Sequence, residues 1–210
     1  MSLFKRLFNK NTQSNSKNVK VGNSGKMHGI TIGTQVWTKT NLDVSLFRNG
    51  ESIFEARSDA EWKNAGTENK PAWCHYDFNP ENGEKYGKLY NWYAVNDARG
   101  LAPSGWHIPT EDELKILKKA VNNNGNKLKA VGEGTEAGAG DNTSGFSALL
   151  AGRHYTSDTH KDLGSHTNFW SSTESSYAYA MNLILFFKDS STYITDDEKK
   201  YGFSVRCLKD

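Results

Sequence analysis

The sequence predicts an α+β domain, and the order of its segments and its composition carry this prediction. Helix signals lie in the middle of the chain, whereas the segments from residue 146 to the end are typical of short strands separated by polar turns. The composition combines 19 glycines, 12% aromatic residues and a mean hydropathy of −0.73. These values indicate a loop-rich globular fold with aromatic anchors. A chain of 210 residues can form one large domain, with or without a tail.

The first element expected in the body is a strand or hairpin over residues 30–44, where β-branched residues flank a Gly-Thr turn signal. A short helix follows over residues 58–66. Ser58 is its expected N-cap, Glu61 stands three residues later as in a capping box, and Gly66 provides a stop signal.

A longer helix is predicted over about residues 87–97. Leu89, Trp92 and Tyr93 would share one helical face, and Gly100 can end the helix.

The helix with the clearest signals is predicted over residues 110–121. Thr110 and Glu113 form a capping-box pattern. The apolar residues that follow recur at helical spacing, and they are Leu114, Leu117 and Val121. The glycine-rich segment 131–145 lacks the lysine of a phosphate-binding loop and predicts an irregular loop.

Residues 1–26 are expected to form a basic polar tail or linker ahead of a domain over residues 27–210. The tail carries six basic groups and no acidic group, so the net charge of +2 leaves −4 for the body. The body therefore lacks the basic surface of a nucleic-acid-binding protein. The tail is either a disordered leader or a short amphipathic helix, "LFKRLF", that docks on an anionic surface or a larger assembly.

No membrane-spanning or secretory segment is expected. Lys5 and Arg6 interrupt the apolar residues of the tail, unlike an export signal, and no apolar run approaches the ~18 residues of a membrane span. These features leave the localisation open between the cytoplasm and export by a signal-independent route.

Six segments in order carry a family resemblance: "IGTQVWTKTNL", "YGKLYNWYAV", "GWHIPTEDEL", "SGFSAL", "FWSSTE" and "GFSVRCLKD". Together they closely resemble the Fibrobacter succinogenes major paralogous domain, a bacterial family, over roughly residues 28–210. That family is more distantly similar to the C-type-lectin-like fold shared with formylglycine-generating enzymes.

The resemblance implies an architecture but no reaction. The first strand, about residues 30–37, would pair antiparallel with the last, about 202–209. The helices near 87–97 and 110–121 would pack on this sheet. Residues from about 125 to 200 would supply loops and a second small sheet.

His107 precedes the helix start at Thr110 and is expected to have a structural role. A metal ligand or general base is the alternative, but the sequence places no proton-accepting partner beside it. We therefore assign no catalytic residue. The residues expected to be structural are Trp37, Trp92, Trp106, His107, Thr110, Glu113 and Trp170.

Three interpretations remain for Cys74 and Cys207. The resemblance implies a disulfide, because C-type-lectin-like domains often bridge the first-helix region to the last strand. The lack of a signal peptide instead favours buried, inert thiols. Reactive thiols of the formylglycine-generating type are the third interpretation.

A metal site is not expected, and neither is a cofactor. His154, His160 and His166 recur every six residues, with Asp158 and Asp162 between them. This spacing is wider than that of local zinc ligands, which favours a polar loop. The usual calcium signatures of lectins are absent.

The late region offers a set of amphipathic residues that suits ligand recognition. The candidate ligand-binding residues are Tyr155, Asp158, His160, Tyr177, Tyr179, Asn182 and Tyr193. The alternative is that the alternating face from Tyr177 to Leu185 is core.

The sequence favours a non-enzymatic recognition module that binds a protein or glycan ligand. Two alternatives remain. One is a structural or cargo component docked by the basic tail, and the other is a formylglycine-generating-type enzyme that uses Cys207 or Cys74.

Overall fold

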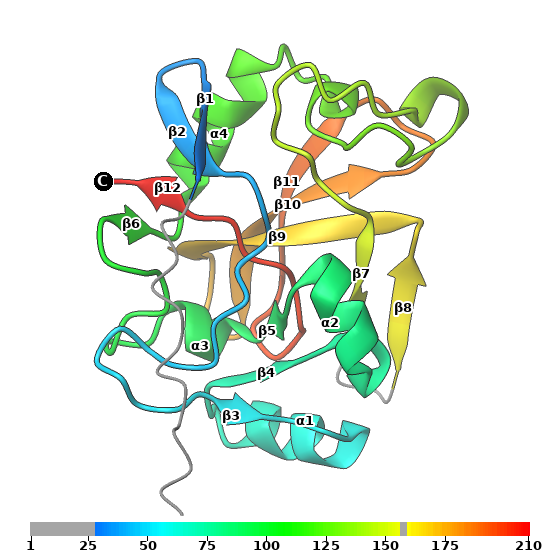
Figure 1. Cartoon of the computed structure of the whole chain (residues 1–210). Helices are drawn as coiled ribbons and strands as arrows, with labels where there is room; N and C mark the ends of the chain where they lie inside the picture. The colour runs from blue at the N-terminus through cyan, green and yellow to red at the C-terminus, as the bar shows by residue number, and fades with distance from the viewer. Residues whose placement is uncertain (1–27, 156–158) are drawn as a thin grey trace, which may run out of the picture.

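The computed structural model describes residues 28–155 and 159–210, which form an α+β fold of three sheets and four α-helices (Figure 1). The α+β prediction is confirmed. The basic tail, residues 1–26, and Asp158 lie outside the described residues. The α-helices are α1 (Asp59–Thr67), α2 (Pro80–Tyr86), α3 (Trp92–Val95) and α4 (Glu111–Ala120). Short 3₁₀ helices cover Tyr76–Phe78, Gly125–Lys127 and Glu136–Gly138.

The first sheet joins the two ends of the body, in the order β1-β2-β12-β6. Its strands are β1 (Gly29–Ile32), β2 (Gln35–Thr38), β6 (Trp106–His107) and β12 (Leu208–Lys209). Gly33, with φ of 59°, turns the chain between β1 and β2. Leu208 of β12 pairs antiparallel with Trp37 of β2. The expected antiparallel contact between the first and last strands is therefore present.

The largest sheet lies in the late region, in the order β11-β10-β9-β7-β8. Its strands are β7 (Ala151–His154), β8 (His160–Leu163), β9 (His166–Glu174), β10 (Tyr179–Phe186) and β11 (Thr192–Glu198). The second sheet was expected to be small, and this expectation is wrong. A third sheet, β3-β4-β5, contains β3 (Phe54–Glu55), β4 (Ala72–Cys74) and β5 (Leu89–Tyr90).

Helix α4 begins and packs as its sequence indicates. Thr110 Oγ1 accepts a bond from Glu113 N, and the Glu113 carboxylate accepts one from Thr110 N. Its buried residues share a cluster with Trp37 of β2 and with Phe169 of β9. The helix therefore packs between the first sheet and the largest sheet, not on the first alone.

The predicted helix over 87–97 is wrong. Gly87, with φ of 75°, ends α2, and residues 89–90 form β5 instead. Tyr90 exchanges backbone hydrogen bonds with Phe203, and β5 pairs with β4. These distant partners override the local helical spacing, and only the short α3 remains helical.

The predicted last strand over 202–209 is also mostly absent, because β12 covers only two residues. Residues 202–208 are all buried and run through the centre of the molecule (Figure 1). Their backbone bonds alternate between separate elements: Gly202 with His154, Phe203 with Tyr90, and Cys207 with Thr38. A segment that changes partner at almost every residue cannot form a regular ladder.

The tryptophans expected to be structural are buried: Trp37 is 1% exposed, Trp92 4%, Trp106 9% and Trp170 0%. Trp170 packs on Phe203 with ring centroids 4.2 Å apart and donates from Nε1 to Tyr90 O at 2.8 Å. The aromatic residues thus anchor the loop-rich chain, as the composition indicates.

Candidate functional site

A surface pocket of about 400 Å³ lies where α3 meets the β9–β10 turn and the end of β11. We call it the aromatic pocket. Its lining residues are Asn69, Trp92, Tyr93, Glu174, Tyr177, Ala178, Glu198, Lys199 and Lys200. Tyr177 is 89% exposed, more than any other large hydrophobic residue described.

Ion pairs and hydrogen bonds hold the walls of the aromatic pocket. Lys199 is buried, with Nζ 2.9 Å from the Glu174 carboxylate and 4.6 Å from the centre of the Trp92 ring. The same ammonium donates to the backbone oxygen of Tyr177 at 2.9 Å. The buried Lys199 ammonium therefore links the backbone of the turn at Tyr177 to Trp92 of α3. A turn with a fixed backbone that presents an exposed ring suits stacking against a sugar or an apolar side chain.

The structure places only part of the predicted ligand-binding set at this pocket. Tyr177 lines it, and Tyr179, 41% exposed, begins the adjoining strand. Tyr193, also 41% exposed, lies at the opposite end of the β10–β11 ladder, where it packs on Phe186. Tyr155 packs edge-on against Tyr201. These tyrosines do not form one surface.

Asn182 is buried at 0% exposure and is not available to a ligand. Asn182 shares one face of β10 with the buried Ala180, whereas Tyr179 lies on the other face. The Asn182 amide accepts from Asn168 Nδ2 at 2.9 Å and donates to Asp197 Oδ2 at 3.0 Å. Burial raises the pKa of Asp197, although the hydrogen bond from Asn182 opposes that rise. Asn182 therefore has a structural role inside the sheet.

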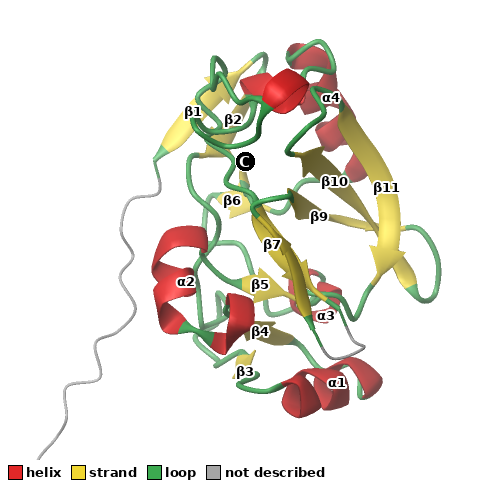
Figure 2. Cartoon of the chain, turned by 90° about the vertical axis from the view of Figure 1, so that its right-hand side faces the viewer, coloured by secondary structure: helices red, strands yellow, loops and turns green. Residues whose placement is uncertain are grey.

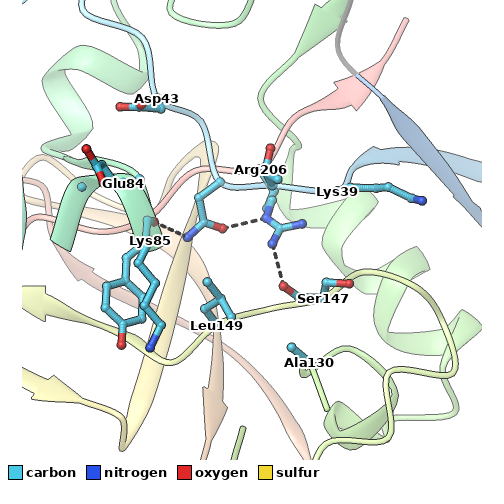
Figure 3. A pocket seen from close by; sticks show the side chains of 13 residues that line it. Lys39, Asp43, Glu84, Lys85, Ala130, Ser147, Leu149 and Arg206 are labelled. Atoms are coloured by element: carbon cyan, nitrogen blue, oxygen red, sulfur yellow. Dashed lines mark hydrogen bonds between the residues drawn. The ribbon is translucent and has the colours of Figure 1, made fainter. Parts of the chain in front are cut away.

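A second pocket of about 400 Å³ lies between the segment after β2, the end of α2 and the loop before β7. Figure 3 shows the guanidinium of Arg206 in the middle of the lining residues, with Lys39 and Lys85 on its two sides. Arg206 is only 1% exposed, and its side chain bonds Asn41 Oδ1 at 2.7 Å and Ser147 O at 3.1 Å. These protein acceptors hold the guanidinium, so Arg206 serves to fix the surrounding segments.

A histidine cluster connects α1 to the β7–β8 hairpin. One ligand atom from each of Asp59, His154 and His160 lies within 4.8 Å of the others. Burial lowers the pKa of His160 to about 3, and repulsion from His154 adds to this shift. His166 lies elsewhere, with Nε2 3.1 Å from Asp162 Oδ2.

The sequence pattern favoured a polar loop over a metal site here, and Asp59 was not among its candidates. His154 and His160 are direct partners in an antiparallel pair, which the six-residue spacing could have shown once a hairpin was assumed. Asp59 stands 95 residues before His154, and no local pattern links the two.

The sequence profile of the Fibrobacter succinogenes major domain matches residues 30–209, which include both pockets and the histidine cluster. The chain belongs to this family. A comparison with curated proteins finds no match. Within the described ranges, no helix combines the length and the apolar character that a membrane span requires.

Both cysteines of this Fibrobacter succinogenes major domain are free and buried, so the disulfide implied by the lectin-like resemblance is not present. They belong to different core clusters. Burial raises the pKa of Cys207 to about 12 and also raises the pKa of Cys74. Both thiols therefore stay protonated near neutral pH, the unreactive form.

His107 of the family domain is held by two carboxylates. Its Nδ1 lies 2.8 Å from Asp210 Oδ1 and its Nε2 lies 3.0 Å from Glu113 Oε1. Burial opposes the charged form, but the two hydrogen bonds outweigh it and raise the pKa of His107. The imidazole thereby joins Asp210 to the first turn of α4 through side-chain contacts.

Proposed function

We propose that the domain is a non-enzymatic recognition module that binds a protein or glycan ligand at the aromatic pocket. The exposed ring of Tyr177, 89% accessible beside a pocket of about 400 Å³, carries this proposal. Isolated exposed aromatics are common, but here the ring borders a hollow whose walls are fixed by buried groups. A pre-ordered aromatic wall loses little conformational entropy on binding.

The proposal includes a C-type-lectin-like architecture. Its support is the sheet that joins β2 to β12 at the two ends of the body, with long loops between them. This arrangement leaves the loops and turns of the late region available to carry a binding surface.

The non-enzymatic part of the proposal rests on the cysteines. A formylglycine-generating-type reaction needs a reactive thiol, and the thiol groups of Cys74 and Cys207 are fully buried with raised pKa values. A thiol that stays protonated is a poor nucleophile and a poor metal ligand.

The test is a glycan and protein array probed with the full chain. Ligands found there are then titrated against Tyr177→Ala and against Tyr193→Ala as the matched control. Tyr193 is an exposed tyrosine five residues along β11 from Glu198, a distance of about 17 Å. We expect Tyr177→Ala to weaken binding roughly tenfold or more, as for a central aromatic contact, and Tyr193→Ala to leave it unchanged.

Two results contradict the proposal. One is an array without any bound ligand. The other is equal loss of affinity in both variants, because the aromatic pocket would then not be the binding surface.

A further inference from the structure

Asp59, His154 and His160 lie together because the end of a hairpin meets the start of a helix. His154 ends β7 and His160 begins β8, and the two are Cα partners with ring centroids 4.2 Å apart. Asp59 is the first residue of α1. Figure 2 shows β7 descending toward α1, and the side-chain contacts place the cluster at this junction.

We propose that Asp59, His154 and His160 bind one divalent transition-metal ion of the zinc class, which joins the β7–β8 hairpin to α1.

The separations suit a tetrahedral ion. Zinc bonds to nitrogen and oxygen are about 2.0–2.1 Å long, which places two ligands of one ion about 3.3 Å apart. Nε2 of His154 and Oδ1 of Asp59 are 3.2 Å apart. The widest separation in the cluster is at most 4.8 Å. Because Asp59 and His154 already lie at about that separation, binding requires His160 to move inward by at most about 1.5 Å, which a small side-chain rotation provides.

The donor set favours zinc over calcium or magnesium. Two imidazoles and one carboxylate are ligands typical of zinc, whereas calcium and magnesium prefer oxygen donors alone. Cys74 Sγ lies 3.7 Å from Nε2 of His160, but burial raises the pKa of this thiol and keeps it protonated, so it is not one of the proposed ligands.

The contacts around the imidazoles suit outer-shell support for a metal. Nδ1 of His154 contacts the backbone oxygen of Tyr155. This contact orients the ring so that Nε2 faces Asp59 Oδ1 at 3.2 Å, and a bound cation would lie between these two atoms. Nδ1 of His160 lies 3.7 Å from Asp77 Oδ1, which is a longer contact and not a hydrogen bond.

Aromatic rings enclose the cluster and link it to the rest of the fold. Trp62 stacks on His154 at 4.9 Å, and Phe78 meets His160 edge-on at 4.7 Å. Nε1 of Trp62 also donates to Lys200 O, a residue of the aromatic pocket. A bound ion would thus brace α1 against one wall of that pocket.

The test uses the full, tag-free chain after treatment with a chelator. Zinc chloride is titrated by calorimetry, the metal content is then measured by elemental analysis, and thermal unfolding is recorded with and without zinc. We expect one zinc per chain, a higher melting temperature with zinc, and no displacement by a large excess of magnesium or calcium.

Two variants probe the ligands, and one serves as a matched control. Asp59→Asn changes a side chain that is 42% exposed, and His160→Gln removes one imidazole. We expect each to weaken zinc binding at least about tenfold and to reduce the thermal shift. His107→Gln is the control, because His107 also lies between two carboxylates but outside the cluster, and its zinc binding should match the wild type.

The absence of stoichiometric zinc would overturn the proposal and leave the His154–Asp59 contact as a direct contact between an imidazole and a carboxylate. Unchanged affinity in Asp59→Asn, with its fold verified by circular dichroism, would overturn it as well. A loss of zinc binding in His107→Gln would show that the metal binds near His107 and not at the proposed cluster, which would also overturn the proposal.

Discussion

Arg206 carries its guanidinium into the interior, where its side chain is 1% exposed. Nη1 donates to Thr38 O at 2.8 Å and to Phe146 O at 2.7 Å, while Nε and Nη2 bond Asn41 and Ser147. Burial lowers the pKa of Arg206 to about 9, so the charge is carried at a cost. This desolvation cost is offset because one side chain donates to acceptors in separate parts of the chain and fixes the C-terminal segment between them.

Replacing Arg206 should therefore destabilise the domain strongly. Arg206→Leu leaves the buried oxygens of Thr38, Phe146 and Ser147 without this donor. We expect the free energy of unfolding to fall by at least about 3 kcal/mol, because each unsatisfied group costs about 1–3 kcal/mol. Arg206→Lys should recover only part of this loss, since one ammonium cannot reach all the acceptors. Urea denaturation measures both changes, and a leucine variant as stable as the wild type would disprove the assigned role.

At the scale of the element, the start of α4 depends on charge. Glu113 caps the helix and also contacts His107. Burial acts against its charge, but bonds from Thr110 and His107 outweigh it and lower the pKa of Glu113. The pKa of His107 is raised by the same contacts and by Asp210. The ion pairs thus form when histidine is protonated and glutamate is ionised.

This geometry predicts a pH window for the stability that His107 provides. Since the folded pKa of His107 is raised, its contribution is complete below the ordinary value of 6.5 and is lost as the pH rises through the folded pKa. The contribution of ionised Glu113 is present above its ordinary value of 4.5 and is lost as the pH falls through its lowered pKa. We expect the stability difference between wild type and His107→Gln to be largest near pH 6 and to shrink toward pH 9, with a size of about 1 kcal/mol or less for these partly exposed groups.

Denaturation at a series of pH values measures that difference. A difference that grows between pH 6 and pH 9 would contradict the assigned ion pairs.

Local signals explain which elements could be predicted. The helices that begin after Ser58 and Thr110 carry side-chain caps, and their starts appear where the sequence places them. Gly66 lies inside α1 and not at its end, since the helix continues to Thr67. Leu89 is spaced from Trp92 and Tyr93 as on a helix, but the backbone of residues 89–90 pairs with the strand β4 instead. Such pairing depends on contacts that no local window contains.

The same reason limits prediction of the candidate sites. Tyr177 could be selected from its composition and its place in a late turn, and it lines the aromatic pocket. Asn182 was grouped with it, although alternation along β10 places Asn182 on the face opposite Tyr179, beside the buried Ala180. Asp59 was missed, because it reaches His154 only through the packing of α1 against the hairpin.

At the scale of the whole molecule, charge divides the chain. The net charge of +2 combines six uncompensated basic groups in residues 1–26 with a body at −4. The Fibrobacter succinogenes major domain begins at residue 30 in the family match, beyond this basic segment. The body is tied together by its own first and last strands, through the pairing of Trp37 with Leu208. Docking of this basic segment to an assembly or an anionic surface is the proposal that stands beside recognition.

This separation predicts that the fragment 27–210 folds as the full chain does. We expect its melting temperature and its ligand binding to be unchanged, because the described core is formed by residues of the body.

Binding of the full chain to anionic vesicles should weaken as salt is added, because salt screens exposed charges beyond about 10 Å at 0.1 M. The fragment should not bind these vesicles. A variant with the six basic residues of the tail replaced by glutamine separates charge from length and should behave as the fragment does. If removal of the tail lowered the melting temperature, or if the fragment bound vesicles as the full chain does, the tail and the body would not be independent units.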